Sequence, residues 1–307
     1  MRVAIVGAGA LGSVYGARLA QLAGCDVSVV ARVPAPASQV RLERVEDGEV
    51  LRWNVPARVD VAPLDADVVL AFVRYEQLDS LPPRVAGGTA PVVVMTPMMP
   101  QDHDRLAAAL GDRLVTGMPS VVSYLNEAGA IRYWLPRMAT TLVESRPPAT
   151  ELAGELVGRL GRAEIAARVE KDVLARNVST TVSFIPLAMA LDAAGSIDAL
   201  LGDDALLHLA LEAADEGREL GRTIGRAEAW ASTLLRFVGP FTLKVGVGLA
   251  RSRAAEACSY VEQHFGRKLH AQNLLMAERI VELAAQKNVP HAALARLLES
   301  LQAVRPL

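Results

Sequence analysis

The segment GAGALG, Gly7 to Gly12, constrains this chain most, because it follows a β-branched run and opens a helical pattern. Its spacing fits G-x-G-x-x-G, which indicates a dinucleotide site only in such a strand–turn–helix context. Gly7 permits the tight turn, Gly9 lets the backbone approach a pyrophosphate, and Gly12 allows close packing of helix on strand. The N–H groups at the helix start, those of Ala10 and Leu11, would face the phosphates. The turn therefore predicts dinucleotide binding, with a purely structural glycine turn as the alternative.

Apolar runs of strand length alternate with helical patterns through the first half of the chain. These runs lie at residues 3–7, 26–32, 66–73 and 90–95. Nearly continuous apolar runs are typical of strands in a parallel sheet that is covered on both faces. Later patterns are helical, with apolar residues three and four positions apart. We therefore predict an α/β fold, with a Rossmann-type doubly wound parallel sheet over residues 1–169 and an all-helical substrate or dimerisation domain over 170–307.

Net charge, the lengths of the apolar runs and the cysteine spacing exclude several classes of protein. A net charge of −2 offers no basic surface for nucleic acid. The apolar run 182–191 is shorter than the about 20 residues that a membrane span needs. Cys25 and Cys258 form no CxxC pair, which is typical of a reducing compartment, so we expect a cytoplasmic protein. Pro186 interrupts a long helical pattern, and we expect a kink or a break there.

The end of the second strand bears on the choice of cofactor. This strand ends in VVAR, at Arg32, and carries no acidic residue there. An acid at this place accepts hydrogen bonds from the ribose hydroxyls of NAD, whereas arginine suits the 2′-phosphate of NADP. The sequence therefore predicts NADP, and the alternative is a solvated arginine.

With these features in view, the sequence resembles the ketopantoate reductase family. The resemblance rests on GAGALGSVYGARLA, VVAR, FVRYEQ, GRK (266–268) and NVP (288–290). It implies an NADP-binding domain, then an all-helical domain, and reduction of a 2-keto acid in the cleft between them. By position, Arg74 replaces a lysine near the cofactor, and Thr96 lies in the stretch where the family has an asparagine that orients cofactor and substrate.

The catalytic positions that the resemblance implies carry other residues here. The family's catalytic lysine falls at Asn177 and its glutamate at His270. Ser259 matches the family's substrate-binding serine if one residue is deleted between Ser259 and His270. Asparagine cannot supply a proton, whereas histidine titrates near neutral pH. His270 is therefore the candidate proton donor, with a helix-surface histidine as the alternative.

In the loop TPMMP (96–100), prolines and the methionines Met98 and Met99 surround the place where the family has its orienting asparagine. Such residues would suit the lining of a site for a more apolar substrate, or a site that no longer catalyses a reaction.

We expect an NADP-dependent oxidoreductase that reduces a carbonyl or imine in a small molecule other than ketopantoate. The alternative is a non-catalytic NADP-binding sensor or interaction protein. No metal site is expected, and the oligomeric state stays open with a homodimer as one expectation.

Overall fold

The computed structural model describes residues 1–31, 33, 35–62, 65–224, 239–253, 255–265 and 267–304. The chain divides into two compact units, Met1–Leu174 and Ala175–Leu307. The first unit is built on β-sheets, and the described part of the second is helical. The predicted fold class, a Rossmann-type sheet followed by a helical region, is therefore confirmed.

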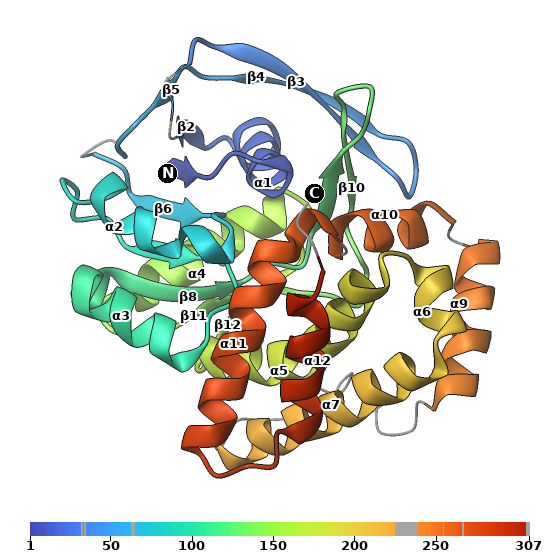
Figure 1. Ribbon diagram of the computed structural model, residues 1–307. Helices are drawn as coiled ribbons and strands as arrows, with labels where there is room; N and C mark the ends of the chain where they lie inside the picture. Colours follow the sequence, from blue (N-terminus) through green and yellow to red (C-terminus); the bar gives the residue numbers. More distant parts are fainter. Residues whose placement is uncertain are drawn as a thin grey trace. The chain divides into compact units, whose positions relative to one another are not determined.

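An eight-stranded sheet forms the centre of the first unit (Figure 1), in the order β12-β11-β8-β7-β6-β1-β2-β5. The strands are β1 Arg2–Val6, β2 Asp26–Val30, β5 Arg58–Val59, β6 Val68–Ala71, β7 Val92–Val94, β8 Leu114–Met118, β11 Thr141–Glu144 and β12 Ala167–Glu170. All neighbouring pairs are parallel except β11 with β8. Every residue of β6 and β7 is buried, and because successive residues point to opposite faces, both faces of the sheet are covered there. The helical segments of this unit are α1 Ala10–Leu22, η1 Tyr75–Ser80, α2 Leu81–Arg84, α3 Pro100–Leu110, η2 Gly111–Arg113 and α4 Thr150–Arg162.

A second sheet, which the sequence did not predict, packs against α1 (Figure 1). Its order is β4-β3-β10-β9, with β3 Ser38–Arg44, β4 Val50–Val55, β9 Val122–Leu125 and β10 Ile131–Trp134. Trp53 of β4 is 3% exposed, and a Cβ placed on Gly16 of α1 would lie 2.7 Å from the Trp53 ring. The helix therefore has glycine where the indole lies against its backbone.

Arg18 on α1 is fully buried and connects the helix to its surroundings. Its Nε donates to the carbonyl of Ala163 at 2.7 Å, just after α4. Its Nη1 and Nη2 donate to Glu49 at 3.0 Å and to Glu164 at 2.5 Å. A further bond reaches the hydroxyl of Tyr133 at 2.9 Å, and burial raises the pKa of that phenol to about 12. A buried guanidinium is tolerated only when its donors are paired in this way.

The second unit consists of helices in its described part (Figure 1). They are α5 Val173–Ala194, which begins at the end of the first unit, α6 Ile197–Gly202, α7 Asp204–Thr223, α9 Pro240–Arg253, α10 Ala255–Phe265, η3 Arg267–Leu269, α11 His270–Gln286 and α12 Ala292–Gln302. The side chains of Ser196 and Asp203 accept N–H groups at the starts of α6 and α7. These caps satisfy donors that a helix start leaves unpaired.

Helix α5 continues through Pro186, so the break expected there is wrong. Proline has no N–H, which leaves the carbonyl of Val182 without its bond along the helix. A Cβ placed on Gly217 of α7 would lie only 1.9 Å from that Val182 oxygen. The two helices therefore meet backbone to backbone beside the proline, at a distance that only glycine permits.

Among the described helices, α5 alone is long and apolar enough to cross a membrane. However, 67% of that apolar stretch is buried inside the protein. The apolar character of α5 therefore matches that of a core helix.

Both cysteines are free. Cys25, which precedes β2, is 6% exposed, and burial raises the pKa of its thiol. Cys258 lies on α10 and is partly exposed.

Replacing Gly217 by alanine tests the close contact of α5 with α7. Alanine is about 1 kcal/mol better than glycine inside a helix, so any loss of stability must come from the clash with Val182. Overpacking costs typically about 1–3 kcal/mol, and we expect the free energy of unfolding in urea to fall by roughly 2 kcal/mol.

Gly221→Ala on the same helix is the matched control, because its Cβ would meet Val182 Cγ2 at an ordinary 3.6 Å. We expect this variant to be as stable as the original protein or slightly more so. Equal stabilities for the two alanine variants would contradict the backbone contact.

Candidate functional site

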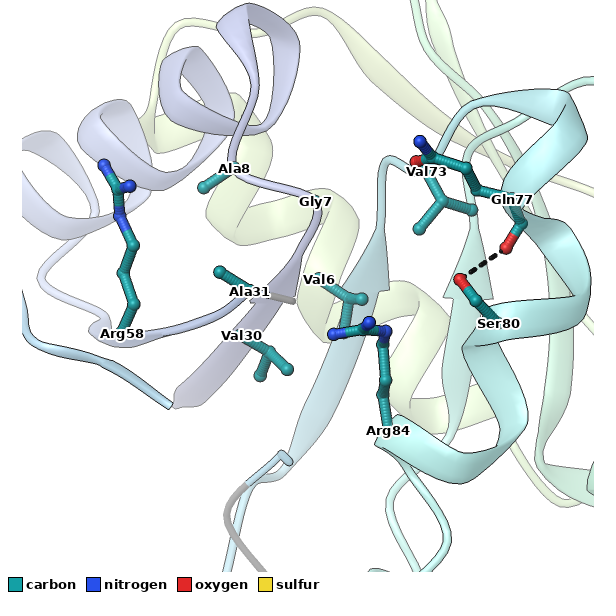
Figure 2. Close-up of a pocket in the computed structure, with 10 residues that line it drawn as sticks. All are labelled: Val6, Gly7, Ala8, Val30, Ala31, Arg58, Val73, Gln77, Ser80 and Arg84. Carbon is teal, nitrogen blue, oxygen red and sulfur yellow. Dashed lines mark hydrogen bonds between the residues drawn. The ribbon is translucent and has the colours of Figure 1, made fainter. Parts of the chain in front are cut away.

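A pocket of about 210 Å³ opens beside the ends of β1 and β2 (Figure 2). Its floor is apolar, with Val6 and Val30 from the two strands and Val73 from the segment after β6. Gly7 and Ala8 of the glycine turn complete one wall. The carboxyl ends of parallel strands are where open α/β sheets bind their ligands, so this pocket is the candidate cofactor site.

Each glycine of the turn lies in a place that a side chain would disturb for a different reason. Gly7 has φ +85°, and a Cβ there would lie 2.7 Å from the carbonyl oxygen of Phe72. A Cβ on Gly12 would lie 2.4 Å from the carbonyl oxygen of Gly7. Gly9, at the start of α1, has no neighbouring atom within 4 Å of a built Cβ, so its outer side is open to a ligand.

Ala10 and Leu11 are the first two residues of α1. Leu11 is partly buried and packs against the core of the first unit, so it would reach a ligand through its backbone N–H. N–H groups in the first turn of a helix have no acceptor within the helix. Phosphate binding by these two residues fits the geometry and stays a prediction.

Two arginines that the sequence analysis missed line the pocket from opposite sides of Val30 and Ala31 (Figure 2). Arg58 begins β5, and Arg84 ends α2. Both side chains are partly buried, and neither has an ion pair or a side-chain hydrogen bond with the described part of the chain. The Arg58 Nε atom is buried without any such partner. An unpaired guanidinium in a pocket favours an anionic ligand.

Arg32, the residue on which the choice of NADP rested, lies outside the described residues. Its neighbour Ala31 does line the pocket. The role of Arg32 therefore stays a prediction, whereas Arg58 and Arg84 are charges that the structure places at the same pocket. No local pattern in the sequence indicates this, because Arg58 reaches the pocket through the pairing of β5 with β2, and Arg84 comes from α2.

The FVRYEQ motif brings Gln77 to the pocket instead of Arg74. The Gln77 N–H donates to the Arg74 carbonyl at 2.9 Å, and Ser80 Oγ donates to the Gln77 carbonyl at 2.7 Å (Figure 2). The Arg74 side chain is 52% exposed, with its Nη1 atom 3.8 Å from the carboxylate of Glu76. Cofactor binding by Arg74 stays a prediction.

Thr96 uses its hydroxyl within the protein. Its Oγ1 donates to the carbonyl of Val73 at 2.5 Å, which ties the segment after β7 to the segment after β6. The side chain is 6% exposed. A cofactor contact by Thr96, predicted from its position, would compete with this internal bond.

The methionines of the TPMMP loop are fully buried, so the interpretation that they wall a substrate site is wrong. Pro100 is instead the first residue of α3, where a missing N–H costs nothing. Asp102 accepts the N–H of Met99 at 3.2 Å and the hydroxyl of Tyr75. Proline and methionine occupy this loop because it starts a helix and fills a core.

His270 is the first residue of α11, and its Nδ1 atom lies 3.1 Å from Oδ2 of Asp192 on α5. Asn273 donates to the same oxygen at 3.0 Å. The Asp192 side chain is fully buried, whereas that of His270 is 15% exposed. His270 was predicted from the sequence, but Asp192, which lies 78 positions away along the chain, was not.

The other two predicted catalytic residues lie on different helices. Asn177 is buried within α5, at 1% exposure. Ser259 is exposed on α10. Their catalytic roles stay predictions.

A family model described as ketopantoate reductase PanE/ApbA matches residues 3–139. No curated protein matches the sequence. Among solved structures, a 2-dehydropantoate 2-reductase from Geobacter metallireducens GS-15 is 17% identical with a TM-score of 0.76, over 98% of this chain and 99% of that one. A dimeric ketopantoate reductase from Staphylococcus aureus is 12% identical with a TM-score of 0.72, over 99% and 98% of the two chains.

A third structure is a ternary complex of D-mandelate dehydrogenase with NADH and anilino(oxo)acetate. It is 13% identical with a TM-score of 0.71, over 99% of this chain and 97% of that one. Identities this low show the fold alone, while the family model matches the sequence of the glycine turn and of the strands around it. Residues 3–139 are therefore similar to the ketopantoate reductase PanE/ApbA family, and the whole chain shares the fold of these solved structures.

Proposed function

We propose that this protein is an NADP-dependent oxidoreductase that reduces a carbonyl or an imine in a small molecule. The observation that carries the proposal is the glycine turn opening α1 beside a pocket lined by two arginines that have no ion pair with the described residues. The match of residues 3–139 to the ketopantoate reductase PanE/ApbA family model supports the class of reaction. The substrate is the open part of the proposal.

The pocket favours NADP over NAD because of its charge. Its described lining includes Arg58 and Arg84 and no aspartate or glutamate. An acid at this place would hold the ribose hydroxyls of NAD and repel a 2′-phosphate. The first-turn N–H groups of α1 would hold the pyrophosphate, and Arg58, Arg84 and Arg32 are the groups offered to the further phosphate. When bound, NADPH would supply a hydride to the substrate.

The proton would come from His270. As hydride reaches a carbonyl carbon, the oxygen becomes an alkoxide that requires a proton. Asn177, at the position of the family's lysine, has no proton to give, whereas an imidazolium does. Ser259 would bind the substrate, as the resemblance implies.

We infer that the substrate is not ketopantoate, because Asn177 and Thr96 replace the lysine and the asparagine of the family. A 2-keto acid or an imine of another shape suits the reaction class. The D-mandelate dehydrogenase neighbour holds an oxo acid derivative other than ketopantoate, so the fold accommodates such ligands.

The neighbour described as dimeric supports a homodimer. A cytoplasmic location fits the two free cysteines.

The second candidate is a non-catalytic NADP-binding protein on the same fold. The replacement of the lysine by Asn177 favours it. The buried carboxylate that contacts His270 counts against it, since it holds a group able to transfer protons.

Titration with NADPH and with NADH, followed by nicotinamide fluorescence, tests the cofactor. Hydrogen bonds to charged groups contribute about 1.5–3 kcal/mol each, so Arg58→Ala or Arg84→Ala should weaken NADPH binding about tenfold to a hundredfold. NADH binding should change little, because NADH lacks the 2′-phosphate. Arg32→Ala belongs in the same series.

Arg52→Ala is the matched control, since this exposed arginine of β4 does not line the pocket. Its affinity for NADPH should equal that of the original protein. Equal binding of NADPH and NADH by the original protein would overturn the choice of NADP, and no binding of either would overturn the cofactor site.

Turnover is tested by NADPH oxidation with a panel of 2-keto acids, aldehydes and imines. We expect slow oxidation with at least one of them and a loss of about 10²-fold in kcat for His270→Gln, the typical contribution of a general acid. The affinity for NADPH should not change in this variant. Tight NADPH binding without oxidation in the whole panel would favour the non-catalytic alternative.

A further inference from the structure

We propose that Asp192 is a positioning residue for His270, which fixes the ring proton on Nδ1 and leaves Nε2 as the nitrogen that exchanges a proton with a ligand. The catalytic meaning of this arrangement rests on the proposed reductase function. The geometry itself lies within α5 and α11 of the second unit.

The direction of the hydrogen bonds follows from the donors around Asp192. The amide Nδ2 of Asn273 donates to Oδ2 of Asp192 at 3.0 Å, and His270 Nδ1 lies 3.1 Å from the same oxygen. An ionised carboxylate accepts only, so Nδ1 must carry the hydrogen that points at it. In a neutral imidazole the other nitrogen, Nε2, is then the acceptor; in the imidazolium, Nε2 carries the second proton.

The location of Asp192 is costly for a residue with a purely structural role. Its side chain is fully buried, and its Oδ1 atom has no hydrogen-bond partner in the described part of the chain. Burying a carboxylate with one oxygen unpaired costs free energy, and a catalytic role is one reason for a protein to keep such a group.

The opposite edge of the ring is the part that a ligand can reach. The His270 side chain is 15% exposed, and its Nε2 forms no hydrogen bond with the described residues. In the proposed reduction, hydride supplied by bound NADPH would add to the carbonyl carbon, and the C=O π electrons would move to oxygen. That oxygen would take the proton from Nε2, whose N–H bond electrons stay on the ring, while the proton on Nδ1 stays hydrogen-bonded to Asp192. Solvent then returns a proton to Nε2.

Nitrogen NMR of the full chain labelled with 15N-histidine tests the position of the proton. The chain has five histidines, and the spectrum of His270→Gln assigns the signal of interest. His208 and His291 are internal references, because their Nδ1 atoms lie 2.7 Å and 2.8 Å from the carbonyls of Asp204 and Val289. A carbonyl accepts only, so both should show Nδ1–H.

We expect His270 to show Nδ1–H when neutral, and to shift towards the Nε2–H form in Asp192→Ala, while His208 and His291 stay unchanged. Asn273→Ala is the matched control, since it removes the other donor to Asp192 and should keep Nδ1–H on His270. An Nε2–H signal for His270 in the original protein, or no change in Asp192→Ala, would overturn the proposal.

Turnover separates a positioning role from a structural one. With the substrate found in the carbonyl panel, Asp192→Asn should lower kcat at least about tenfold with KM and NADPH affinity unchanged, because a neutral amide cannot stabilise the imidazolium. Asp192→Glu should recover part of kcat, and Asn273→Ala should keep most of it. If kcat instead falls in proportion to the melting temperature in both the Asp192→Asn and Asn273→Ala variants, Asp192 is structural only.

If the original protein oxidises no NADPH with any substrate, the reductase function fails and the NMR result still decides whether Asp192 positions His270.

Discussion

The first unit depends on the approach of α1 to β1 at the glycine turn. Gly12 lies so close to the carbonyl of Gly7 that no side chain fits between them, and further along the helix Gly16 lies against Trp53. Two turns into the helix, the buried Arg18 bonds to the residues that follow α4 and to the second sheet. These contacts fix the start of α1 at the pocket, so its free N–H groups are held in place before any ligand arrives.

The sequence predicted structure correctly where that structure depends on neighbouring residues. The glycine turn indicates a strand, a tight bend and a helix within a few residues, and the structure has all three. It failed where partners are far apart in the chain. β3 and β4 alternate polar and apolar residues, yet the pairing of β3 with β10 and the packing of β4 on α1 could not be read locally. A kink or a break was expected at Pro186, but α5 continues through it, with Gly217 packed against the carbonyl of Val182.

The same distinction separates the residues predicted to be functional. The candidate cofactor pocket lies beside the glycine turn, so the glycine spacing pointed to it. His270 and Asp192 lie on separate helices of the second unit, and Asp192 has no signature of its own beside His270 in the sequence. The arginines at the pocket belong to the second kind, since Arg58 and Arg84 come from different elements. The TPMMP loop was predicted to line a substrate site, but its methionines are buried in the core.

The unequal environments of the two cysteines have a practical consequence. The thiolate is the reactive form of cysteine, so a buried thiol with a raised pKa reacts slowly. Cys25 is such a thiol, whereas Cys258 is partly exposed and adjoins Ser259 on α10. A maleimide dye would therefore attach selectively at Cys258 of the natural chain. Energy transfer from a bound reduced nicotinamide to that dye would report how far α10 lies from the cofactor, without any engineered label site.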